Sequence, residues 1–249
     1  MAQVYIGTSG FYYRHWLGKF YPKNIKHDQL LAFYSKYFNT VEINSTFYRL
    51  PLEKTVAGWK KTVGNQFVFS LKMSRYVTQF GALSPEVSSL KLFFERVVPL
   101  ASSPPRHLVL FQTSPPLKFN ENKLKNLLEK LPNNFRYSFE FRHQSWFNEK
   151  TYQILKQAGA ALVFADSPIK NNSRIFPKAD VETANFFYFR FHGSQSLYSS
   201  FYTDKELQFY AELIKKKLKK GIDVYAYFNN DVEGYAIVNA LRLKKLVSA

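Results

Sequence analysis

The sequence predicts an α/β protein whose eight parallel strands alternate with helices in a single (β/α)8 barrel of the TIM type. Eight short runs rich in β-branched and aromatic residues alternate with longer segments of helical periodicity. The chain has 249 residues, close to the roughly 250 residues that such barrels need. No linker, internal repeat or low-complexity tract interrupts the alternation. The sequence therefore predicts one domain over residues 1–249.

The predicted strands lie near residues 3–9, 40–46, 67–74, 107–114, 136–142, 160–167, 186–193 and 223–230. The predicted helices lie near residues 28–38, 53–63, 85–100, 121–131, 146–158, 204–220 and 232–246. Residues 168–185 have no helical period, so we expect an irregular rim connection there, with at most one short turn of helix. Alternation of strand and helix favours a parallel sheet. Eight strands in a chain of this length favour a closed barrel; the alternative is a doubly wound open sheet.

Local signals support several helix ends. Pro85 follows Ser84, which places proline at the first position of a helix, where its missing N–H costs little. Thr203 with Glu206 three residues later fits a capping box at the start of the helix near 204–220. Gly221 stands where that helix should end.

The composition excludes some kinds of site. The chain has no cysteine, which excludes a disulfide framework, a thiolate zinc site and an iron–sulfur cluster held by thiolates. The sequence begins Met-Ala-Gln-Val without the basic and apolar regions of a secretory signal. No run approaches the roughly 18 apolar residues of a membrane span. We therefore expect a cytoplasmic protein without a membrane partner.

The chain is strongly basic, with a net charge of +17. Such a field attracts polyanions and anionic small molecules. Part of the charge has a simpler interpretation. The lysines within residues 215–220 fall on the face of a predicted helix opposite its apolar stripe, as on a solvated surface.

Polar residues gather at the carboxyl ends of the predicted strands, where active sites of such barrels lie. Because side chains alternate along a strand, Arg190 and His192 share one face and Phe189 and Phe191 share the other. Charged groups inside a barrel are costly unless they are paired or serve a ligand. A structural ion network explains any single residue, but the whole set favours a ligand pocket. The set is Thr8, Ser9, Glu42, Asn44, Lys72, Arg75, Gln112, Glu140, Arg142, Asp166, Arg190, His192, Asn229, Asn230 and Asp231.

The connection after the first strand, residues 10–27, is long and mixes aromatic with basic residues. Such a mixture can stack on nucleobases or sugar rings, or its rings can form an apolar cover on the barrel. Both interpretations stay open. The residues concerned are Phe11, Tyr12, Tyr13, Arg14, His15, Trp16, Lys19, Phe20 and Tyr21. A second rim segment, residues 194–203, carries Tyr198, Phe201 and Tyr202.

Motifs for cofactors are absent from the sequence. It has no phosphate loop, no GxGxxG after a strand, no HExxH and no nucleophile elbow. Residues 7–10, Gly-Thr-Ser-Gly, form a short segment whose backbone amides could cradle an anion. Glu42, Glu140, Asp166 and His192 could hold a divalent metal, but no metal-ligand spacing supports this and nearby Arg and Lys compete for the carboxylates. We therefore predict no protein-bound metal, and the sequence leaves the cofactor unknown.

Several long motifs stand in order along the chain, at residues 6–10, 16–22, 41–51, 139–142, 145–146, 165–167, 190–193 and 227–231. With these motifs the sequence resembles the YecE-like family, also called the domain of unknown function 72 family, along nearly its whole length. The resemblance implies a (β/α)8 barrel and supplies no reaction. Two departures matter: Thr78-Gln79 stands where such sequences often carry Thr-His, and the two prolines after Gln112 come one residue late, at Pro115-Pro116.

The leading functional hypothesis is an enzyme, a hydrolase, lyase or isomerase, acting on a phosphorylated or carboxylated small molecule. His192 is the acid–base group, because the unperturbed pKa of histidine lies near neutrality. The other catalytic candidates are Glu42 or Glu140 as general base, and Asp166. The substrate-binding candidates are Lys72, Arg75, Arg142 and Arg190 for the anion, with Asn44, Gln112, Asn229, Asn230, Asp231, Thr8 and Ser9. Two alternatives stay open: a nucleic-acid-binding or nucleic-acid-processing barrel, and a non-catalytic ligand-binding barrel. The oligomeric state is not predicted.

Overall fold

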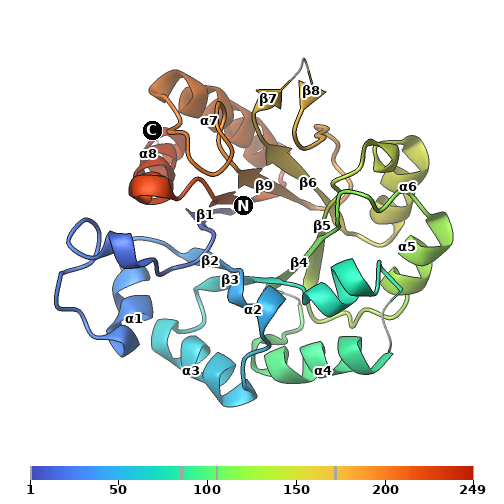
Figure 1. Cartoon of the computed structure of the whole chain (residues 1–249), viewed down its shortest axis with the longest axis horizontal. Coiled ribbons are helices and arrows are strands. Elements are labelled where there is room, and N and C mark those ends of the chain that lie inside the picture. Colours follow the sequence, from blue (N-terminus) through green and yellow to red (C-terminus); the bar gives the residue numbers. More distant parts are fainter. Residues whose placement is uncertain (1, 85–86, 105, 171–172, 249) are drawn as a thin grey trace. The chain divides into compact units, whose positions relative to one another are not determined.

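The computed structural model describes residues 2–84, 87–104, 106–170 and 173–248 (Figure 1). The chain forms two compact units. Unit 1 comprises residues 1–42, 164–176 and 185–249, and unit 2 comprises residues 43–163 and 177–184. The single domain over residues 1–249 stays a prediction.

Unit 1 is built on parallel strands. β1 (Val4–Thr8) and β9 (Phe186–Phe191) each pair with β10 (Asp223–Phe228) in parallel register. β2 (Thr40–Ile43) lies beside β1, where the N–H of Gly10 donates to the carbonyl of Glu42 at 2.7 Å. The end of β6 (Ala161–Asp166) lies beside β9, where the N–H of His192 donates to the carbonyl of Asp166 at 3.0 Å.

The helices of unit 1 are α1 (Leu30–Tyr34), α7 (Asp204–Lys219) and α8 (Tyr235–Ser248), which lie along and beside these strands (Figure 1). α7 packs against α8, and α8 packs against β1 and β10. The predicted capping box of α7 is confirmed, because the side chains of Thr203 and Glu206 bond each other's backbone N–H groups.

Unit 2 repeats the same pattern. β3 (Val68–Lys72), β4 (Leu108–Gln112), β5 (Arg136–Glu140) and the first residues of β6 pair in parallel, each with the next. Its longer helices are α3 (Glu53–Val63), α4 (Val87–Val97), α5 (Glu121–Leu128) and α6 (Glu149–Gln157). α3 contacts α4, and α5 contacts α6. The order of strands and helices in both units confirms the predicted alternation.

Two segments differ from the prediction. The strand predicted over 40–46 ends at Ile43, and a short helix α2 (Ser45–Tyr48) follows. The chain turns there because the Thr46 hydroxyl donates to the carbonyls of Ile43 and Lys72, at 3.0 and 2.7 Å. In the connection 168–185 the described residues contain no turn of helix, an outcome that the prediction allowed. A two-stranded antiparallel pair, β7 (Ile169–Lys170) and β8 (Ser173–Arg174), stands there instead.

The start predicted for α4 at Pro85 lies outside the described residues. None of the helices within the described ranges combines the length and the apolarity that a membrane span needs. The cytoplasmic location stays a prediction.

β9 shows how the polar and apolar faces are separated in unit 1. All six of its residues are buried, as expected for a parallel strand covered on both faces. Phe189 and Phe191 contact Tyr210 of α7, with ring centroids 6.4 and 4.8 Å apart. Tyr188 and Arg190 point to the other face, where both bond Glu42. The predicted division of this strand into a polar and an aromatic face is confirmed.

His107 is a buried base just before β4 in unit 2. Its side chain is 5% exposed, and its Nδ1 accepts a hydrogen bond from the N–H of Phe69 at 3.1 Å. Burial, and then the positive charges of Lys60 and Arg106, lower the pKa of His107 to about 4. The neutral ring is therefore part of the folded structure.

We expect His107 to make the fold sensitive to acid. The folded-state pKa lies below the roughly 6.5 of an unfolded chain, so its contribution to stability is complete above about pH 6.5 and is lost as pH falls toward 4, by ~3 kcal/mol at most. His107→Asn keeps an acceptor for Phe69 and removes the titration. Urea unfolding between about pH 7.5 and 4.5 should therefore show a steeper loss of unfolding free energy in the unsubstituted chain. His27→Asn, at an exposed histidine, is the control; parallel curves for the chain and His107→Asn would contradict the assignment.

Candidate functional site

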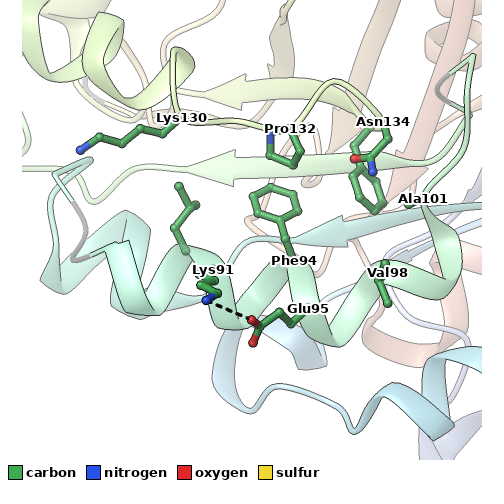
Figure 2. A pocket seen from close by; sticks show the side chains of 10 residues that line it. Lys91, Phe94, Glu95, Val98, Ala101, Lys130, Pro132 and Asn134 are labelled. Atoms are coloured by element: carbon green, nitrogen blue, oxygen red, sulfur yellow. Dashed lines mark ion pairs between the residues drawn. The ribbon is translucent and has the colours of Figure 1, made fainter.

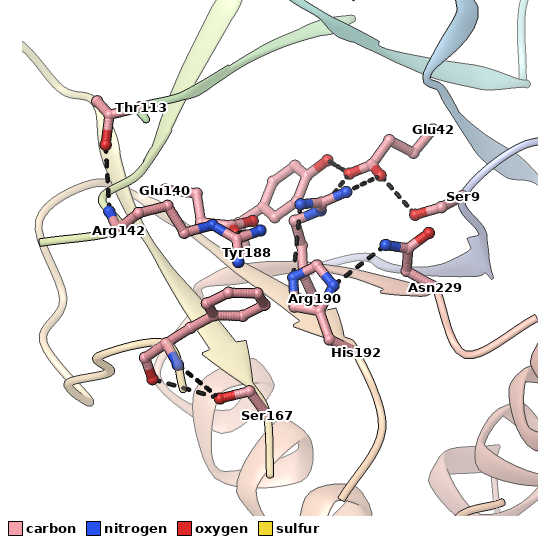
Figure 3. A network of polar contacts seen from close by, with 11 residues as sticks. Ser9, Glu42, Thr113, Glu140, Arg142, Ser167, Tyr188, Arg190, His192 and Asn229 are labelled. Atoms are coloured by element: carbon pink, nitrogen blue, oxygen red, sulfur yellow. Dashed lines mark hydrogen bonds and ion pairs between the residues drawn. The ribbon is translucent and has the colours of Figure 1, made fainter. Parts of the chain in front are cut away.

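Glu42 and Arg190 form a fully buried ion pair at the carboxyl ends of β2 and β9 in unit 1 (Figure 3). Arg190 Nη2 donates to Glu42 Oε1 at 2.7 Å, and Arg190 Nε donates to Oε2 at 3.0 Å. Tyr188 donates to Oε2 at 2.7 Å, and Ser9 donates to Oε1 at 2.5 Å. The guanidinium is thereby held in a two-point geometry.

These contacts decide the charge of Glu42. Burial alone would raise its pKa, but the charge of Arg190 and the hydrogen bonds from Arg190, Ser9 and Tyr188 hold the pKa below its usual value. Glu42 is thus a fixed carboxylate with four donated hydrogen bonds. The arrangement favours a positioning role toward Arg190 over the predicted role of general base.

His192 stands next to this pair with both ring nitrogens engaged. Its Nε2 lies 3.5 Å from Arg190 Nη1, and its Nδ1 lies 3.1 Å from the side-chain amide of Asn229 at the end of β10 (Figure 3). The Arg190 guanidinium and the Asn229 amide nitrogen are both donors, whereas a neutral imidazole has a single lone pair, so at most one of the two contacts is a hydrogen bond accepted by the ring. Phe176 and Tyr198 contact the ring edge-on, with centroids 5.1 and 5.6 Å away. The imidazole is therefore fixed in place and orientation.

The rim segment after β9 turns sharply over His192. Gly193 has a φ of 103°, and a Cβ there would lie 2.3 Å from the carbonyl oxygen of Ser196, so only glycine fits. Tyr198 has a φ of 63°, which is uncommon for a residue with a side chain. Its N–H donates to the carbonyl of His192 at 2.6 Å. Tyr198 is 40% exposed, so its ring lies between His192 and the solvent.

Asp166, predicted as catalytic, supports this rim. Its Oδ2 accepts a hydrogen bond from Tyr202 at 2.8 Å, and its Oδ1 lies 3.4 Å from Arg174 of β8. The Tyr202 hydroxyl oxygen in turn accepts the N–H of Gly193 at 3.0 Å. Burial, and then the charge of Asp166, raise the pKa of Tyr202 well above its usual value, so it remains a donor.

Asn230, predicted to bind substrate, also fastens the rim. Its Nδ2 donates to the carbonyl of Ser200 and to Oδ1 of Asn239 in α8, both at 2.9 Å. Asn239 bonds both the N–H and the carbonyl of Tyr202, at 3.1 and 2.9 Å. Both amides are buried. These contacts favour a structural role for Asn230.

Asp231 forms a second acid–base pair that the sequence did not indicate. Its Oδ1 accepts the indole N–H of Trp16 at 2.9 Å, and its Oδ2 lies 3.0 Å from His15 Nε2. Burial raises the pKa of Asp231 to about 6, against the lowering effects of Trp16 and His15. The turn that follows is unusual, since Glu233 has a φ of 61°. The sequence predicted Asp231 as a site residue because it follows a strand, but it did not predict the contacts with Trp16 and His15.

The aromatic residues of the connection 10–27 mostly pack inward. Trp16 and Tyr21 are 0% and 1% exposed, and Phe20 packs edge-on against Phe33 of α1 with centroids 5.6 Å apart. Tyr12, at 38%, is exposed. This favours the apolar-cover interpretation of the segment over base stacking. Thr8 belongs to the same layer, because its hydroxyl donates to the carbonyl of Gly10 at 2.6 Å.

Unit 2 contains its own ion pair at the carboxyl end of β5. Arg142 Nη2 contacts Glu140 Oε1, and the Arg142 N–H donates to Thr113 Oγ1 at 3.1 Å (Figure 3). The Glu140 and Arg142 side chains are 1% and 4% exposed. The two side chains share a face, as the alternation predicted. Their roles as base and anion ligand stay predictions.

The other predicted residues of unit 2 lie at the ends of β2, β3 and β4. Lys72 is buried with its Nζ 4.3 Å from the centroid of Phe47. Arg75 lies beside exposed aromatic rings and has a buried Nε without a hydrogen-bond partner among the described residues. Asn44 precedes α2 and has a buried Oδ1 that likewise lacks one. Gln112 ends β4 and is partly buried.

The structure thus divides the predicted set between the two units. Unit 2 holds Asn44, Lys72, Arg75, Gln112, Glu140 and Arg142, and unit 1 holds Thr8, Ser9, Glu42, Asp166, Arg190, His192, Asn229, Asn230 and Asp231. In unit 1, contacts join Ser9, Glu42, Arg190, His192 and Asn229 into one network. Tyr188 was not among the predicted residues, although it lies two residues before Arg190 and so faces the same side. No group of three or more His, Asp or Glu side chains that could hold a metal occurs within the described ranges.

Unit 2 also carries a surface pocket that the sequence did not predict. It has a volume of about 570 Å³ and lies between α4 and the turn before β5 (Figure 2). Its lining is mostly apolar, with Lys91 and Glu95 paired at 3.8 Å on its rim. Phe135 lies just before the amino end of β5, so the pocket is near the end of the strand where barrels rarely carry catalytic groups.

Parallel strands followed by helices, with buried polar side chains at the carboxyl ends of the strands, define a barrel protein of the (β/α) class with a polar site. Residues 5–249 match the family model described as "Protein of unknown function DUF72". The chain belongs to this family, as its motifs indicated.

Relatives in bacteria share the sequence pattern. The chain is 32% identical to UPF0759 protein YecE of Escherichia coli over 142 residues, which span 54% of this chain and 51% of that protein. The match therefore covers about half the length of that relative. The chain is 23% identical to UPF0759 protein YunF of Bacillus subtilis over 98% of this chain and 94% of that protein.

Solved structures confirm the fold class. A DUF72 family protein from Thermotoga maritima is 30% identical, with a TM-score of 0.88 over 99% of this chain and 100% of that one. One from Enterococcus faecalis is 21% identical, with a TM-score of 0.83 over 100% of this chain and 99% of that one. A protein named SacUVDE shares the fold alone, at 10% identity and a TM-score of 0.60. The fold is the predicted (β/α)8 barrel rather than the doubly wound alternative.

We expect the Glu42–Arg190 pair to be costly to break. Glu42→Gln keeps the shape but removes the carboxylate charge that faces the buried guanidinium, and breaking such a pair costs about 3–5 kcal/mol. Urea unfolding of Glu42→Gln, Arg190→Met and the double variant measures this, and the double variant should recover part of the loss. Glu233→Gln breaks an exposed pair with Lys19 and should lower the unfolding free energy much less, because solvent screens exposed pairs. If Glu42→Gln and Glu233→Gln lowered the unfolding free energy by the same amount, the assignment would be contradicted.

We expect Asp231 to reduce stability as pH rises. Its folded-state pKa of about 6 lies above the roughly 3.9 of an unfolded chain, so its contribution is complete below about pH 4 and is lost as pH rises through 6. Asp231→Asn removes the buried charge. The unfolding free energy of this variant, relative to that of the unsubstituted chain, should therefore rise by ~1–2 kcal/mol between about pH 4 and pH 8. Urea unfolding at both pH values checks this. Asp28→Asn, at an exposed aspartate, should show no such change, and a pH-independent difference for Asp231→Asn would be the contrary result.

Proposed function

We propose that the protein is an enzyme that acts on an anionic, phosphorylated or carboxylated small molecule, with His192 as its acid–base group. The observation that carries the proposal is the position of His192 between Arg190 and Asn229. Two nitrogens of Arg190 are fixed on Glu42, and the third, Nη1, is the one nearest the imidazole. A base whose orientation is set by a neighbouring group is the arrangement that proton transfer requires.

The roles follow from these contacts. His192 would accept a proton from a substrate at the ring nitrogen that carries its lone pair, and the Arg190 charge would stabilise negative charge that develops beside it. Glu42 would act as a positioning residue, because its oxygens hold Arg190 in a fixed plane. Asn229 would fix the tilt of the imidazole. Hydrolase, lyase and isomerase chemistry all use such a proton transfer.

The free energy needed to bury these ionisable side chains favours a functional role over a stabilising one. Glu42, Arg190 and His192 are at most 1% exposed, and buried ion pairs rarely stabilise a fold more than apolar residues of the same volume. Ionisable groups in such surroundings are enriched at functional sites. Tyr198 and Asn229 are the more exposed neighbours of His192, so a ligand would reach the ring on their side.

Unit 2 carries candidate anion ligands of its own. Lys72, Arg75 and Arg142 would bind an anion in that unit, and Glu140 would be its candidate base. The net charge of +17 favours the approach of anionic molecules. A non-catalytic binder remains the alternative that the experiment must separate from an enzyme.

The test combines binding and turnover. Inorganic phosphate, p-nitrophenyl phosphate and panels of sugar phosphates and hydroxycarboxylates are titrated by calorimetry and assayed for turnover. We expect His192→Gln to lower turnover by about 10²–10⁴-fold with binding changed only a few-fold, since it removes proton transfer and keeps a polar side chain. His27→Gln, an exposed histidine of the same unit, should leave both unchanged.

Two outcomes would overturn the proposal. Turnover by His192→Gln at the rate of the unsubstituted chain would remove His192 from the chemistry. Binding that depends on His192 and Asn229, with no turnover of any compound in the panels, would favour the non-catalytic binder.

A further inference from the structure

Exposed aromatic rings concentrate at one edge of unit 2. Among the described residues the four most exposed aromatic side chains are Phe80, Tyr48, Phe209 and Tyr76, at 68%, 64%, 63% and 55%. Three of these follow the carboxyl ends of two strands: Tyr48 lies in α2, just after β2, and Tyr76 and Phe80 follow β3. Single exposed apolar residues are ordinary, but rings gathered at the functional end of the strands are not explained by packing.

Local backbone structure presents Tyr76 and Phe80 together. Residues Tyr76–Phe80 form one turn of π-helix, a rare form that occurs often at functional sites. The turn buries Val77 and Thr78 and leaves the rings of Tyr76 and Phe80 outward, with centroids 5.5 Å apart. It is therefore the buried side of the turn that fixes the position of the rings.

The segment after the turn contains two residues in a strained backbone conformation that surrounding contacts hold in place. Ala82 and Leu83 have φ angles of 45° and 63°, which residues with side chains rarely adopt. Leu83 is 1% exposed, and its N–H donates to the carbonyl of Val77 at 3.2 Å. Such strain persists only where surrounding contacts impose it, and it clusters at ligand sites.

A cation accompanies the rings. The guanidinium carbon of Arg75 lies 5.8 Å from the centroid of Tyr76 and 5.7 Å from that of Phe80. Its Nε has no hydrogen-bond partner among the described residues. Arg75 therefore places a positive charge beside two flat apolar faces.

The neighbouring segment has the same character. The Thr46 hydroxyl of α2 bonds the carbonyl of Lys72 at 2.7 Å, which anchors α2 to the end of β3 (Figure 1). Tyr48 and Arg49 in this segment are both exposed. Residues 44–52 and 73–84 contain no Asp or Glu, and their charged residues are Arg49 and Arg75. Nothing in these two segments would repel a negative charge.

We propose that Tyr48, Tyr76 and Phe80, with Arg49 and Arg75, form a binding surface for nucleobases that carry phosphate, as in a nucleotide or a single strand of nucleic acid. Flat rings stack on bases of any sequence, and neighbouring arginines bind the phosphates, which is how single strands are held without sequence preference. The surface includes Arg75, which is also proposed above as an anion ligand of unit 2, and the stacking of a base goes beyond the proposed reaction. The packed rings of residues 10–27 have no part in it.

The experiment measures binding of a fluorescein-labelled oligothymidylate of about ten nucleotides by anisotropy, since stacking contributes to each bound base. An abasic oligomer of equal length and charge, and thymidine monophosphate as competitor, are run beside it. The variants are Tyr76→Ser with Phe80→Ser, and Tyr76→Phe with Phe80→Tyr, which keeps both rings. Phe209→Ser removes an equally exposed ring on α7 and is the matched control.

We expect the double serine variant to weaken binding by about tenfold or more for each ring in contact with a base. The ring-keeping variant and Phe209→Ser should bind as the unsubstituted chain does. Competition by the mononucleotide would identify a nucleotide as the ligand, and binding of the oligomer alone would identify a strand; both outcomes support the surface. Thermal melting confirms that the variants are folded, since both rings are exposed.

Three results would overturn the proposal: equal affinity of the double serine variant, equal affinity for the abasic oligomer, or no binding of the oligomer and the mononucleotide at low salt. Equal affinity for the abasic oligomer would reduce the interaction to a field effect of the basic chain. The role of His192 is tested separately by turnover assays of its variants, so none of these three results decides it.

Discussion

The polar layer of unit 1 depends on the pair between Glu42 and Arg190. Neither charge is tolerable alone at that depth, so the end of β2 must lie where the guanidinium from β9 can reach it. Ser9 from β1 and Tyr188 from β9 complete the coordination of the carboxylate. Three strands are thus aligned at their carboxyl ends by one anion, and His192 takes its place from the same guanidinium.

A second constraint keeps the rim in order. Asp166, Tyr202 and Asn239 form a chain of hydrogen bonds from the end of β6 to α8. The sharp turn at Gly193 brings the segment back over the imidazole. Several polar residues that sequence position places near a ligand are therefore occupied in holding the rim, which explains why a strand-end position alone does not identify a catalytic group.

Much of this architecture could be predicted from the sequence, because period and parity depend on local chemistry. β9 is an example: alternate Phe residues face α7, while Tyr188 and Arg190 face Glu42. Other features depend on contacts between distant segments. The hydrogen bond that the Trp16 indole donates to Asp231 joins residues 215 positions apart, and no local pattern in the sequence indicates it. The helix α2 was missed because the turn at Thr46 depends on a carbonyl of β3.

β6 belongs to both compact units. Its first residues pair with β5 in unit 2, and its last carbonyl accepts the N–H of His192 in unit 1. The boundary between Val163 and Phe164 falls inside this strand. A fragment that ends at Val163 or begins at Phe164 therefore contains only part of β6, and cutting the chain at this position yields neither unit with the strand intact.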